Sequence, residues 1–258
     1  MRRFVTSVVL AAFALSCIFF APAPLLFIVV AGVACLCYRE FARIARGSGV
    51  EGPLGWGMAA GVAAMIWPES IPVITVLVLS VALGLQDLGR ALGFAAAVAL
   101  GLVYIFLPWR NAWDLRLIHP YWLFFALAIN WIGDVAAYFT GRKFGRHKLA
   151  PRVSPGKSIE GAVGSMFASA VFGVAFAVAT GIGTSMFEVS VLSVLANAAG
   201  QAGDLAESAM KRGAGVKDSG TLLPGHGGVL DRLDSSLFSL PVVYAWLQWV
   251  SPLFAGGV

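Results

Sequence analysis

The chain has 258 residues, of which 59% are hydrophobic and only 12% charged, and its formal net charge is +5. A soluble domain carries about 25% charged residues, so this composition excludes an ordinary soluble domain and indicates an integral membrane protein. Basic loops interleaved with aromatic residues are absent from the sequence, which argues against nucleic acid as a partner.

Apolar windows about as long as a bilayer-spanning helix recur along the chain. No segment alternates between polar and apolar residues as a transmembrane β-strand does. We therefore expect an all-α, polytopic fold with about nine transmembrane helices, of which the third is short and rich in glycine. The spans are predicted near residues 4–20, 24–38, 54–68, 71–86, 91–108, 120–140, 159–181, 186–202 and 236–252.

The distribution of cations predicts the orientation of these spans, because cytoplasmic loops carry an excess of Lys and Arg. With the N-terminus in the cytoplasm, only Arg110 and Arg116 of the 18 Lys and Arg residues fall outside. Dropping one span scatters the cations over both sides, so nine spans are favoured. We expect residues 1–110 to form N-terminal transmembrane scaffold helices and residues 111–258 to form a transmembrane catalytic region. Its polar loops, 141–158 and 203–235, then lie together on the cytoplasmic side.

A dense polar run from Ser208 to Asp234 interrupts the apolar character of the C-terminal part. Polar groups this dense beside membrane helices indicate a water-filled functional site. The run combines cations, carboxylates and a glycine-rich turn, which suits nucleotide phosphates and a metal ion. Its members are Lys211, Arg212, Lys217, Asp218, Gly225, His226, Gly227, Gly228, Asp231, Arg232 and Asp234.

Helical spacing places further polar residues on common faces. Asn130, Asp134, Tyr138 and Gly141 form one stripe of the predicted span 120–140, where Asp134 is expected to face a cavity. A purely structural hydrogen bond between helices remains the alternative for Asp134. Further on, Asp204, Glu207, Ser208 and Lys211 share one helix face, on which Glu207 and Lys211 are spaced as an intrahelical ion pair.

Residues 141–161 contain a second candidate phosphate site. Ser154 and Pro155 are suited to begin the next helix, whose free backbone N–H groups, next to Lys157, favour a bound phosphate. Arg142, Lys143 and Lys148 are candidates for additional phosphate contacts, although anchoring of a cytoplasmic loop explains each of them equally well. Glu160, at the start of a span, is less easily explained in that way.

Asp204 and Asp231 are the candidate metal ligands. Mg²⁺ prefers one or two carboxylates together with waters and substrate phosphates. The three histidines, His119, His147 and His226, lack ligand spacing, so a histidine- or cysteine-based metal site is not expected.

These residues resemble the signature of the phosphatidate cytidylyltransferases (CDP-diglyceride synthases). That signature consists of a Ser, Lys-Arg, Lys-Asp, His-Gly-Gly and Asp-Arg-x-Asp at fixed spacing, and every element is present. The matching residues are Ser208, Lys211, Arg212, Lys217, Asp218, His226, Gly227, Gly228, Asp231, Arg232 and Asp234. Upstream, the resemblance includes Asp134, Tyr138, Arg142, Ser154, Lys157, Glu160 and Asp204. This chain departs from the family in having Gly156 where a second lysine is usual and Ser158 where a threonine is usual.

The resemblance implies transfer of CMP from CTP to phosphatidic acid, giving CDP-diacylglycerol and pyrophosphate in phospholipid biosynthesis. It implies a membrane enzyme, often a homodimer, that uses Mg²⁺ and a second, monovalent cation such as K⁺. For a bacterial protein the expected location is the inner (plasma) membrane, with the active site facing the cytoplasm. The implied catalytic residues are Asp204, Lys211, Lys217, Asp218 and Asp231; the implied substrate-binding residues are Asp134, Tyr138, Arg142, Ser154, Lys157, Glu160, Ser208, Arg212, His226, Gly227, Gly228 and Arg232.

Two other functions are compatible with a polar site in a membrane. A CTP-dependent lipid-alcohol kinase also needs a nucleotide site at the bilayer surface. An anion transporter would line a path between the two faces with its charges, whereas the polar residues here gather on one side.

Overall fold

A computed structural model describes residues 2–50, 54–84, 88–182, 185–223, 225 and 227–251. These residues are mostly helical, so the expected all-α class is confirmed. The α-helices are α1 (Arg2–Phe20), α2 (Ala23–Gly47), α3 (Leu54–Ile66), α4 (Ile71–Leu83), α5 (Ala91–Gly101), α6 (Leu107–Ile118), α7 (Pro120–Phe144), α8 (Ile159–Thr180), α9 (Met186–Gly213) and α10 (Leu230–Ala245). The shorter elements are η1 (Pro68–Ser70), η2 (Leu88–Arg90), η3 (Leu102–Phe106), η4 (Trp246–Val250), β1 (Lys148–Ala150) and β2 (Ser154–Ser158).

Within the described residues, 4 helical segments are long and apolar enough to cross a membrane. They are α2, the continuous helix from Ala91 to Ile118, α7 and α8. Ala11–Phe20, Leu54–Ile66 and Pro68–Leu83 are apolar but shorter. An integral membrane protein with helical spans agrees with this finding, whereas the count of nine spans and the cytoplasmic N-terminus stay predictions.

The chain divides into two compact units. Unit 1 contains residues 1–110 and 209–233, and unit 2 contains residues 111–208 and 234–258. The functional division expected at residue 110 stays a prediction. Residues 209–233, which are most of the polar run 208–234, belong to the same compact unit as the N-terminal helices.

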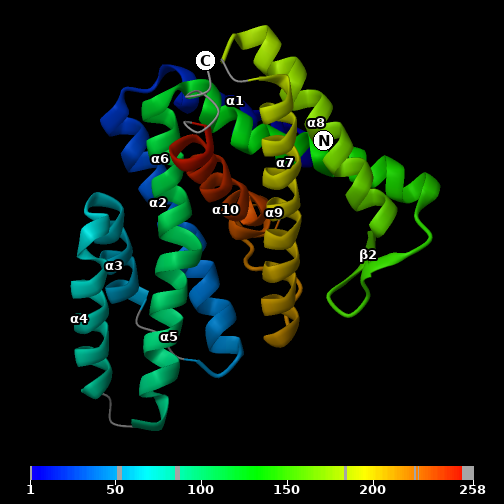
Figure 1. Ribbon diagram of the computed structural model, residues 1–258. Helices are drawn as coiled ribbons and strands as arrows, with labels where there is room; N and C mark the ends of the chain where they lie inside the picture. Colours follow the sequence, from blue (N-terminus) through cyan, green and yellow to red (C-terminus); the bar gives the residue numbers. More distant parts are fainter. Residues whose placement is uncertain are drawn as a thin grey trace. The chain divides into compact units, whose positions relative to one another are not determined.

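Aromatic side chains and glycines pack together in unit 1. Tyr38 of α2 and Phe106 of η3 are buried, with ring centroids 5.4 Å apart. A Cβ atom added at Gly57 of α3 would overlap the Tyr38 ring, and one at Gly61 would overlap the Phe106 ring. The glycines of α3 thus let its backbone approach two rings closely. Beyond them α3, α4 and α5 lie side by side (Figure 1).

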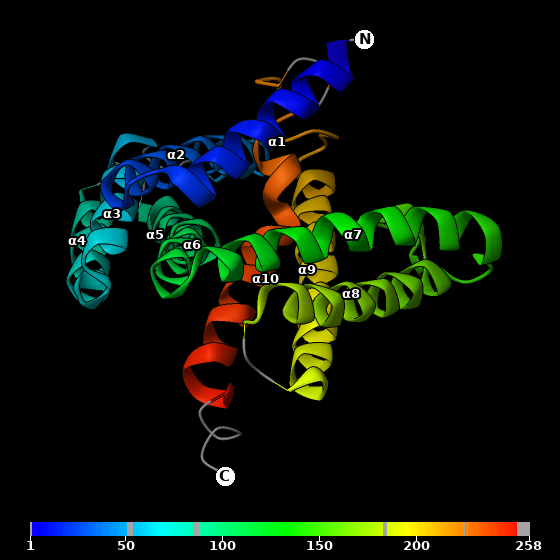
Figure 2. The ribbon, with the colours of Figure 1, turned by 90° about the horizontal axis from the view of Figure 1, so that it is seen from above.

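In unit 2, α7 and α8 run antiparallel and lie side by side along their length (Figure 2). Small residues line their contact, as in many membrane helix pairs. A Cβ at Gly133 of α7 would collide with Ser165 of α8 and with Asn197 of α9. The Ser165 hydroxyl donates to Asn197 Oδ1 at 3.0 Å, and the Ser169 hydroxyl donates to the Ile129 carbonyl at 3.2 Å.

A β-hairpin, rather than a loop and a helix start, connects α7 to α8. β1 pairs with β2 in antiparallel register, Lys148 opposite Ser158 and Ala150 opposite Ser154. The prediction that Ser154 caps the next helix is therefore wrong. Ser158 caps α8 instead, its hydroxyl accepting from the Gly161 N–H at 3.1 Å. Pro155 disfavours helical backbone at the residue before it, which is consistent with an extended Ser154.

The polar segment 203–235 was expected to be a loop, but much of it is helical, because α9 extends into its first part and α10 begins before its end. α9 continues without a break to Gly213, so Asp204, Glu207, Ser208 and Lys211 all belong to it. α10 begins at Leu230 and includes Asp231 and Asp234. Only the stretch between Gly213 and Leu230 lies outside these helices.

Candidate active site

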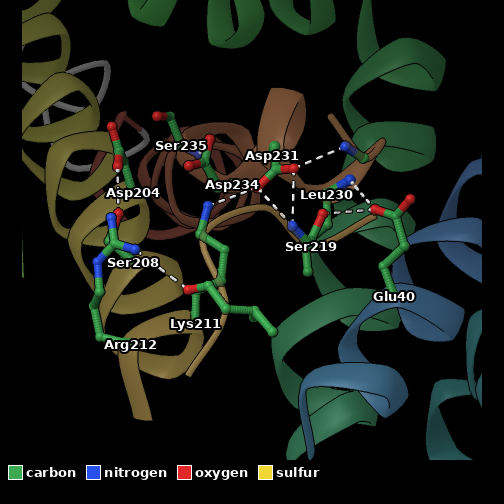
Figure 3. A network of polar contacts seen from close by, with 12 residues as sticks. Glu40, Asp204, Ser208, Lys211, Arg212, Ser219, Leu230, Asp231, Asp234 and Ser235 are labelled. Carbon is green, nitrogen blue, oxygen red and sulfur yellow. Dashed lines mark hydrogen bonds and ion pairs between the residues drawn. The ribbon is translucent and has the colours of Figure 1, made fainter. Parts of the chain in front are cut away.

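Asp231 is the centre of a hydrogen-bonded cluster in unit 1. Its Oδ1 lies 2.6 Å from Lys211 Nζ, and its Oδ2 accepts from the Gly228 N–H at 2.8 Å. The backbone N–H of Ser219 lies 3.1 Å from Oδ1 and 3.0 Å from Oδ2. Figure 3 shows Lys211 and Ser219 directed at the carboxylate. Two backbone donors and one flexible ammonium group therefore hold Asp231 in one orientation.

The charge state of Asp231 follows from these contacts. Burial alone would raise the pKa of this carboxyl, but the hydrogen bonds from Lys211, Gly228 and Ser219 and the charge of Lys211 outweigh it. The pKa is therefore lowered from its ordinary value of 3.8. Asp231 is ionised at neutral pH, which suits a ligand of a cation.

The glycine-rich turn before α10 packs against the same carboxylate. Gly227 has a φ of +82°, a conformation that side-chain-bearing residues rarely adopt. A Cβ at Gly227 would approach Asp231 Oδ2 to 2.6 Å and Asp218 Cβ to 3.7 Å. The turn is closed by the Leu223 N–H, which donates to the Gly227 carbonyl at 3.0 Å. The candidate residue His226 lies outside the described residues.

Asp204 is the centre of a second cluster, in unit 2. Its Oδ2 lies 2.6 Å from Lys157 Nζ at the end of β2, and its Oδ1 accepts from the Ser208 hydroxyl at 3.3 Å. The Lys157 and Asp204 side chains are 29% and 28% exposed. A ligand from solvent can therefore reach this ion pair.

A cavity of about 350 Å³ adjoins this second cluster in unit 2. Lys157 and Arg142 contribute cations to its wall, and Asp134, Ser158 and Gln201 contribute polar groups. The Arg142 guanidinium donates to the Tyr138 hydroxyl at 3.1 Å, and Tyr138 also lines the cavity. Asp134, Tyr138, Arg142 and Lys157, which the sequence placed in one site, thus border one cavity.

Glu160 holds the segment between α7 and β1. Its carboxylate accepts from the Arg146 N–H at 3.1 Å and from the His147 N–H at 3.2 Å. The His147 ring lies 2.7 Å from Glu160 Oε1. These contacts keep the hairpin attached to the start of α8, next to the cavity wall formed by Ser158.

The remaining candidates lie at the surface. Lys217, Asp218, Arg212 and Arg232 are exposed. The Arg212 guanidinium donates to the Val216 carbonyl at 3.3 Å. Ser154 lies in β2, where its register partner is Ala150.

Two residues of the Asp231 cluster were not predicted from the sequence, Ser219 and Glu40. Ser219 lies inside the signature run, between Asp218 and His226. Its contact with Asp231 is made by the backbone N–H, which no side-chain pattern can predict. Glu40 of α2 accepts a hydrogen bond from the Ser219 hydroxyl at 2.8 Å. The signal for Glu40 was a single carboxylate among the three arginines in the last turns of α2, which indicates a functional or structural partner.

No group of three or more His, Cys, Asp or Glu side chains that could hold a metal ion occurs among the described residues. The carboxylates of Asp204 and Asp231 nevertheless each bind an ammonium group at 2.6 Å. The donor chemistry of both carboxylates is thus suited to a hard cation.

Helices able to span a bilayer indicate an integral membrane protein, and each of its two units contains one lysine–aspartate cluster. The model of the cytidylyltransferase family matches residues 1–250. This chain belongs to the cytidylyltransferase family.

Curated relatives are named phosphatidate cytidylyltransferase. The protein of Staphylococcus saprophyticus is 36% identical over 149 residues, which are 58% of this chain and 57% of the relative. A Staphylococcus aureus protein is 37% identical over the same length, with the same coverage. The Bacillus subtilis protein is 37% identical over 157 residues, 60% of this chain and 58% of the relative. The matched region is therefore less than two thirds of each of these relatives.

Proposed function

We propose that this protein is a CTP:phosphatidate cytidylyltransferase. It transfers CMP from CTP to phosphatidic acid and releases CDP-diacylglycerol and pyrophosphate. The observation that carries this proposal is the 36–37% identity to proteins named phosphatidate cytidylyltransferase. The family membership and the two lysine–aspartate clusters support it.

The reaction joins two anions, so its first requirement is neutralisation of charge. An oxygen of the lipid phosphate attacks the α-phosphorus of CTP, and the bond from that phosphorus to the oxygen bridging to the β-phosphate breaks. The electron pair leaves with pyrophosphate. The lipid phosphate is already ionised near neutral pH, so the protein needs no strong general base. Alignment and electrostatic stabilisation of the transition state supply most of the catalysis.

Lys211, Lys217 and Arg212 are proposed to neutralise the nucleotide phosphates, together with Ser208 and Arg232. Lys211 is the best placed of them to respond to a substrate. Its ammonium group is at the end of a flexible side chain, whereas the other donors to Asp231 are backbone N–H groups. A phosphate can therefore draw Lys211 away from Asp231 without unfolding the cluster.

Asp204 and Asp231 are proposed as ligands of Mg²⁺, with Asp218 as a further carboxylate near Asp231. Each of the two aspartates already binds a positive group, so replacement of an ammonium group by a metal ion leaves neither carboxylate without a positive partner. Bound Mg²⁺ would neutralise phosphate charge and hold the reacting groups in line. A monovalent cation such as K⁺ is proposed as a second ion.

The 350 Å³ cavity in unit 2 is proposed to receive a phosphate-bearing group of a substrate. Lys157 and Arg142 offer positive charge at its wall, and Ser158, Tyr138 and Gln201 offer neutral polar groups. Phosphate oxygens accept hydrogen bonds from all these types of donor. Both the lipid phosphate and the nucleotide phosphates can accept these hydrogen bonds. The KM values of a Lys157 variant for CTP and for phosphatidate decide which of the two substrates the cavity binds.

The enzyme is proposed to act in the bacterial inner membrane, as a homodimer, with its active site facing the cytoplasm. Residues 141–158 and 203–235 would then be accessible from the same side. Single cysteines introduced at Lys148 and Lys217, in a chain lacking Cys17, Cys35 and Cys37, test this arrangement. A membrane-impermeant thiol reagent should label both from the cytoplasmic side. Labelling from opposite sides would contradict the proposed topology.

The reaction itself is tested by the fate of labelled phosphates. With phosphatidic acid as acceptor, label from the α-phosphate of CTP should enter the lipid and label from the γ-phosphate should leave as pyrophosphate. Label from the γ-phosphate in lipid would indicate a CTP-dependent kinase and overturn the proposal. Movement of an anion across sealed vesicles without any labelled lipid would indicate a transporter.

A further inference from the structure

Glu40 is a buried carboxylate of unit 1 that the proposed mechanism has not used. It lies in α2 and is 4% exposed. Its Oε2 accepts hydrogen bonds from the Ser219 hydroxyl and from the Leu230 backbone N–H, both at 2.8 Å. Burial of a carboxylate costs free energy unless hydrogen bonds compensate it, so these contacts determine where the carboxylate can lie.

Both partners of Glu40 are directly connected to Asp231. The backbone N–H of Ser219 contacts both carboxylate oxygens of Asp231. Leu230 precedes Asp231 in the sequence and is the first residue of α10. Figure 3 shows Glu40 on one side of Ser219 and Leu230, and Asp231 on the other. One carboxylate oxygen therefore fixes both the donor to Asp231 and the helix end that carries Asp231.

The contact with Leu230 also satisfies a donor at the start of α10. The first N–H groups of a helix have no partner within that helix, and a negatively charged acceptor there is favourable. Here the acceptor comes from a different helix, 190 positions away in the sequence. A hydrogen bond of this kind holds the first residue of α10 against α2 within unit 1.

Two glycines of the polar segment are explained by the same carboxylate. A Cβ added at Gly220 or at Gly228 would overlap the Glu40 carboxylate. Gly228 also donates its N–H to Asp231 Oδ2 at 2.8 Å. The absence of side chains at these positions lets the segment lie against Glu40 on one side and Asp231 on the other.

We propose that Glu40 is a positioning residue for Asp231, acting through Ser219 and Leu230. It touches no substrate; it holds the 219–230 segment so that the Asp231 carboxylate keeps its orientation. The role of Asp231 on which this rests belongs to the proposed function. The N-terminal helices thereby contribute a specific group to the site rather than only a scaffold.

The side-chain test compares Glu40→Ala, Glu40→Gln and Ser219→Ala with a matched control, Glu188→Gln. Glu188 is also 4% exposed, and it accepts from Trp246 Nε1 at 3.0 Å in unit 2. We expect Glu40→Ala to lower kcat by about 10- to 100-fold, because a small misplacement of a reacting group has effects of that size. The KM for phosphatidate should stay within about twofold, since no lipid contact is lost. Glu40→Gln should retain most activity because its amide oxygen accepts the same two hydrogen bonds, and Glu188→Gln should retain it fully.

If Glu40→Ala does not fold, Ser219→Ala still tests the contact between Glu40 and Ser219. It removes the hydroxyl bond to Glu40 but leaves the backbone contact with Asp231. We expect Ser219→Ala to lower kcat by about 3- to 10-fold, a smaller loss than in Glu40→Ala. Because Ser219 and Glu40 share one contact, the double variant Ser219→Ala with Glu40→Gln should lose no more activity than the more impaired of the two single variants. Full activity in both Ser219→Ala and Glu40→Ala would overturn the inference, as would inactivity of Glu40→Gln with normal hydrogen exchange.

Hydrogen exchange supplies a readout that does not depend on the reaction. In protein without substrates, the peptide covering 217–231 should exchange faster in Glu40→Ala than in wild type, and at the wild-type rate in Glu188→Gln. Unchanged exchange of this peptide in Glu40→Ala would contradict the positioning role even if activity fell. If wild-type protein formed no CDP-diacylglycerol, the proposed function would fail, while the exchange result would still decide the role of Glu40 in holding the segment.

Discussion

Lys211 Nζ and Asp231 Oδ1 lie 2.6 Å apart, and their side chains are only 10% and 7% exposed. An ion pair this well buried differs from an exposed one, because removal of one partner leaves a charge that water cannot solvate. The pair connects the end of α9 with the start of α10 in unit 1. It therefore combines a structural role with the proposed role in charge neutralisation.

The first prediction concerns the charge of Asp231. Asp231→Asn should abolish CTP-dependent labelling of lipid, because the amide is a much poorer ligand for a cation and for Lys211. Membrane insertion should be unaffected, but stability should fall because Lys211 loses its charged partner, so activity is compared per amount of folded protein. Glu69→Gln, which changes an exposed carboxylate of η1, is the control and should keep wild-type activity. A wild-type rate in Asp231→Asn would remove Asp231 from the site.

The second prediction separates the two roles of the pair. Lys211→Met alone should destabilise the protein by about 3–5 kcal/mol, since it leaves Asp231 buried without its partner. The double change Lys211→Met with Asp231→Asn should recover part of that stability, because no buried charge is left unpaired and the amide oxygen can still accept from a backbone N–H of Ser219 or Gly228. Thermal unfolding in detergent measures stability, and the labelled-CTP assay measures activity. Recovery of activity in the double variant would contradict a catalytic role for the pair.

The third prediction concerns Lys157, which pairs with Asp204 and lines the cavity of unit 2. Lys157→Ala should lower kcat/KM by about 10- to 100-fold, the effect of losing one hydrogen bond to a charged group. A rise in the KM for CTP alone would assign the cavity to the nucleotide, and a rise in the KM for phosphatidate alone would assign it to the lipid. Lys148→Ala, an exposed lysine of β1, should have little effect. Equal activity of Lys157→Ala and Lys148→Ala would exclude Lys157 from the site.

The fourth prediction concerns the family departure at Gly156. No atom lies within 4 Å of the position that a Cβ would occupy at Gly156, so a larger side chain is accommodated. Gly156→Lys should leave activity unchanged or raise it, because it adds a cation at the cavity wall. Initial rates at subsaturating CTP and at subsaturating phosphatidate measure the effect. A large loss would mean that the hairpin of this chain handles substrate differently from the family.

The sequence predicted those features that depend on local patterns. Apolar windows indicated the long helices α2, α7 and α8, and helical spacing placed Asp204 and Ser208 on one helix. The signature run also included both partners of the Lys211–Asp231 contact. These features depend on residues close in the sequence or on a motif of fixed spacing.

Features that depend on distant contacts were not predicted. Glu40 and Ser219 are separated by 179 positions, and neither composition nor periodicity connects two such residues. The start of α8 was placed at Ser154 from its capping preference, whereas pairing of β1 with β2 makes Ser154 extended and leaves the cap to Ser158. In both cases a tertiary contact overrides a local preference.

The most direct test of the account uses the purified protein in detergent with Mg²⁺, phosphatidate and one nucleoside triphosphate at a time. Release of pyrophosphate and formation of lipid product are measured together. We expect CTP to yield CDP-diacylglycerol and pyrophosphate in equal amounts, and ATP, GTP and UTP not to replace it. Absence of lipid product with CTP, or lipid product without matching pyrophosphate, would contradict this expectation.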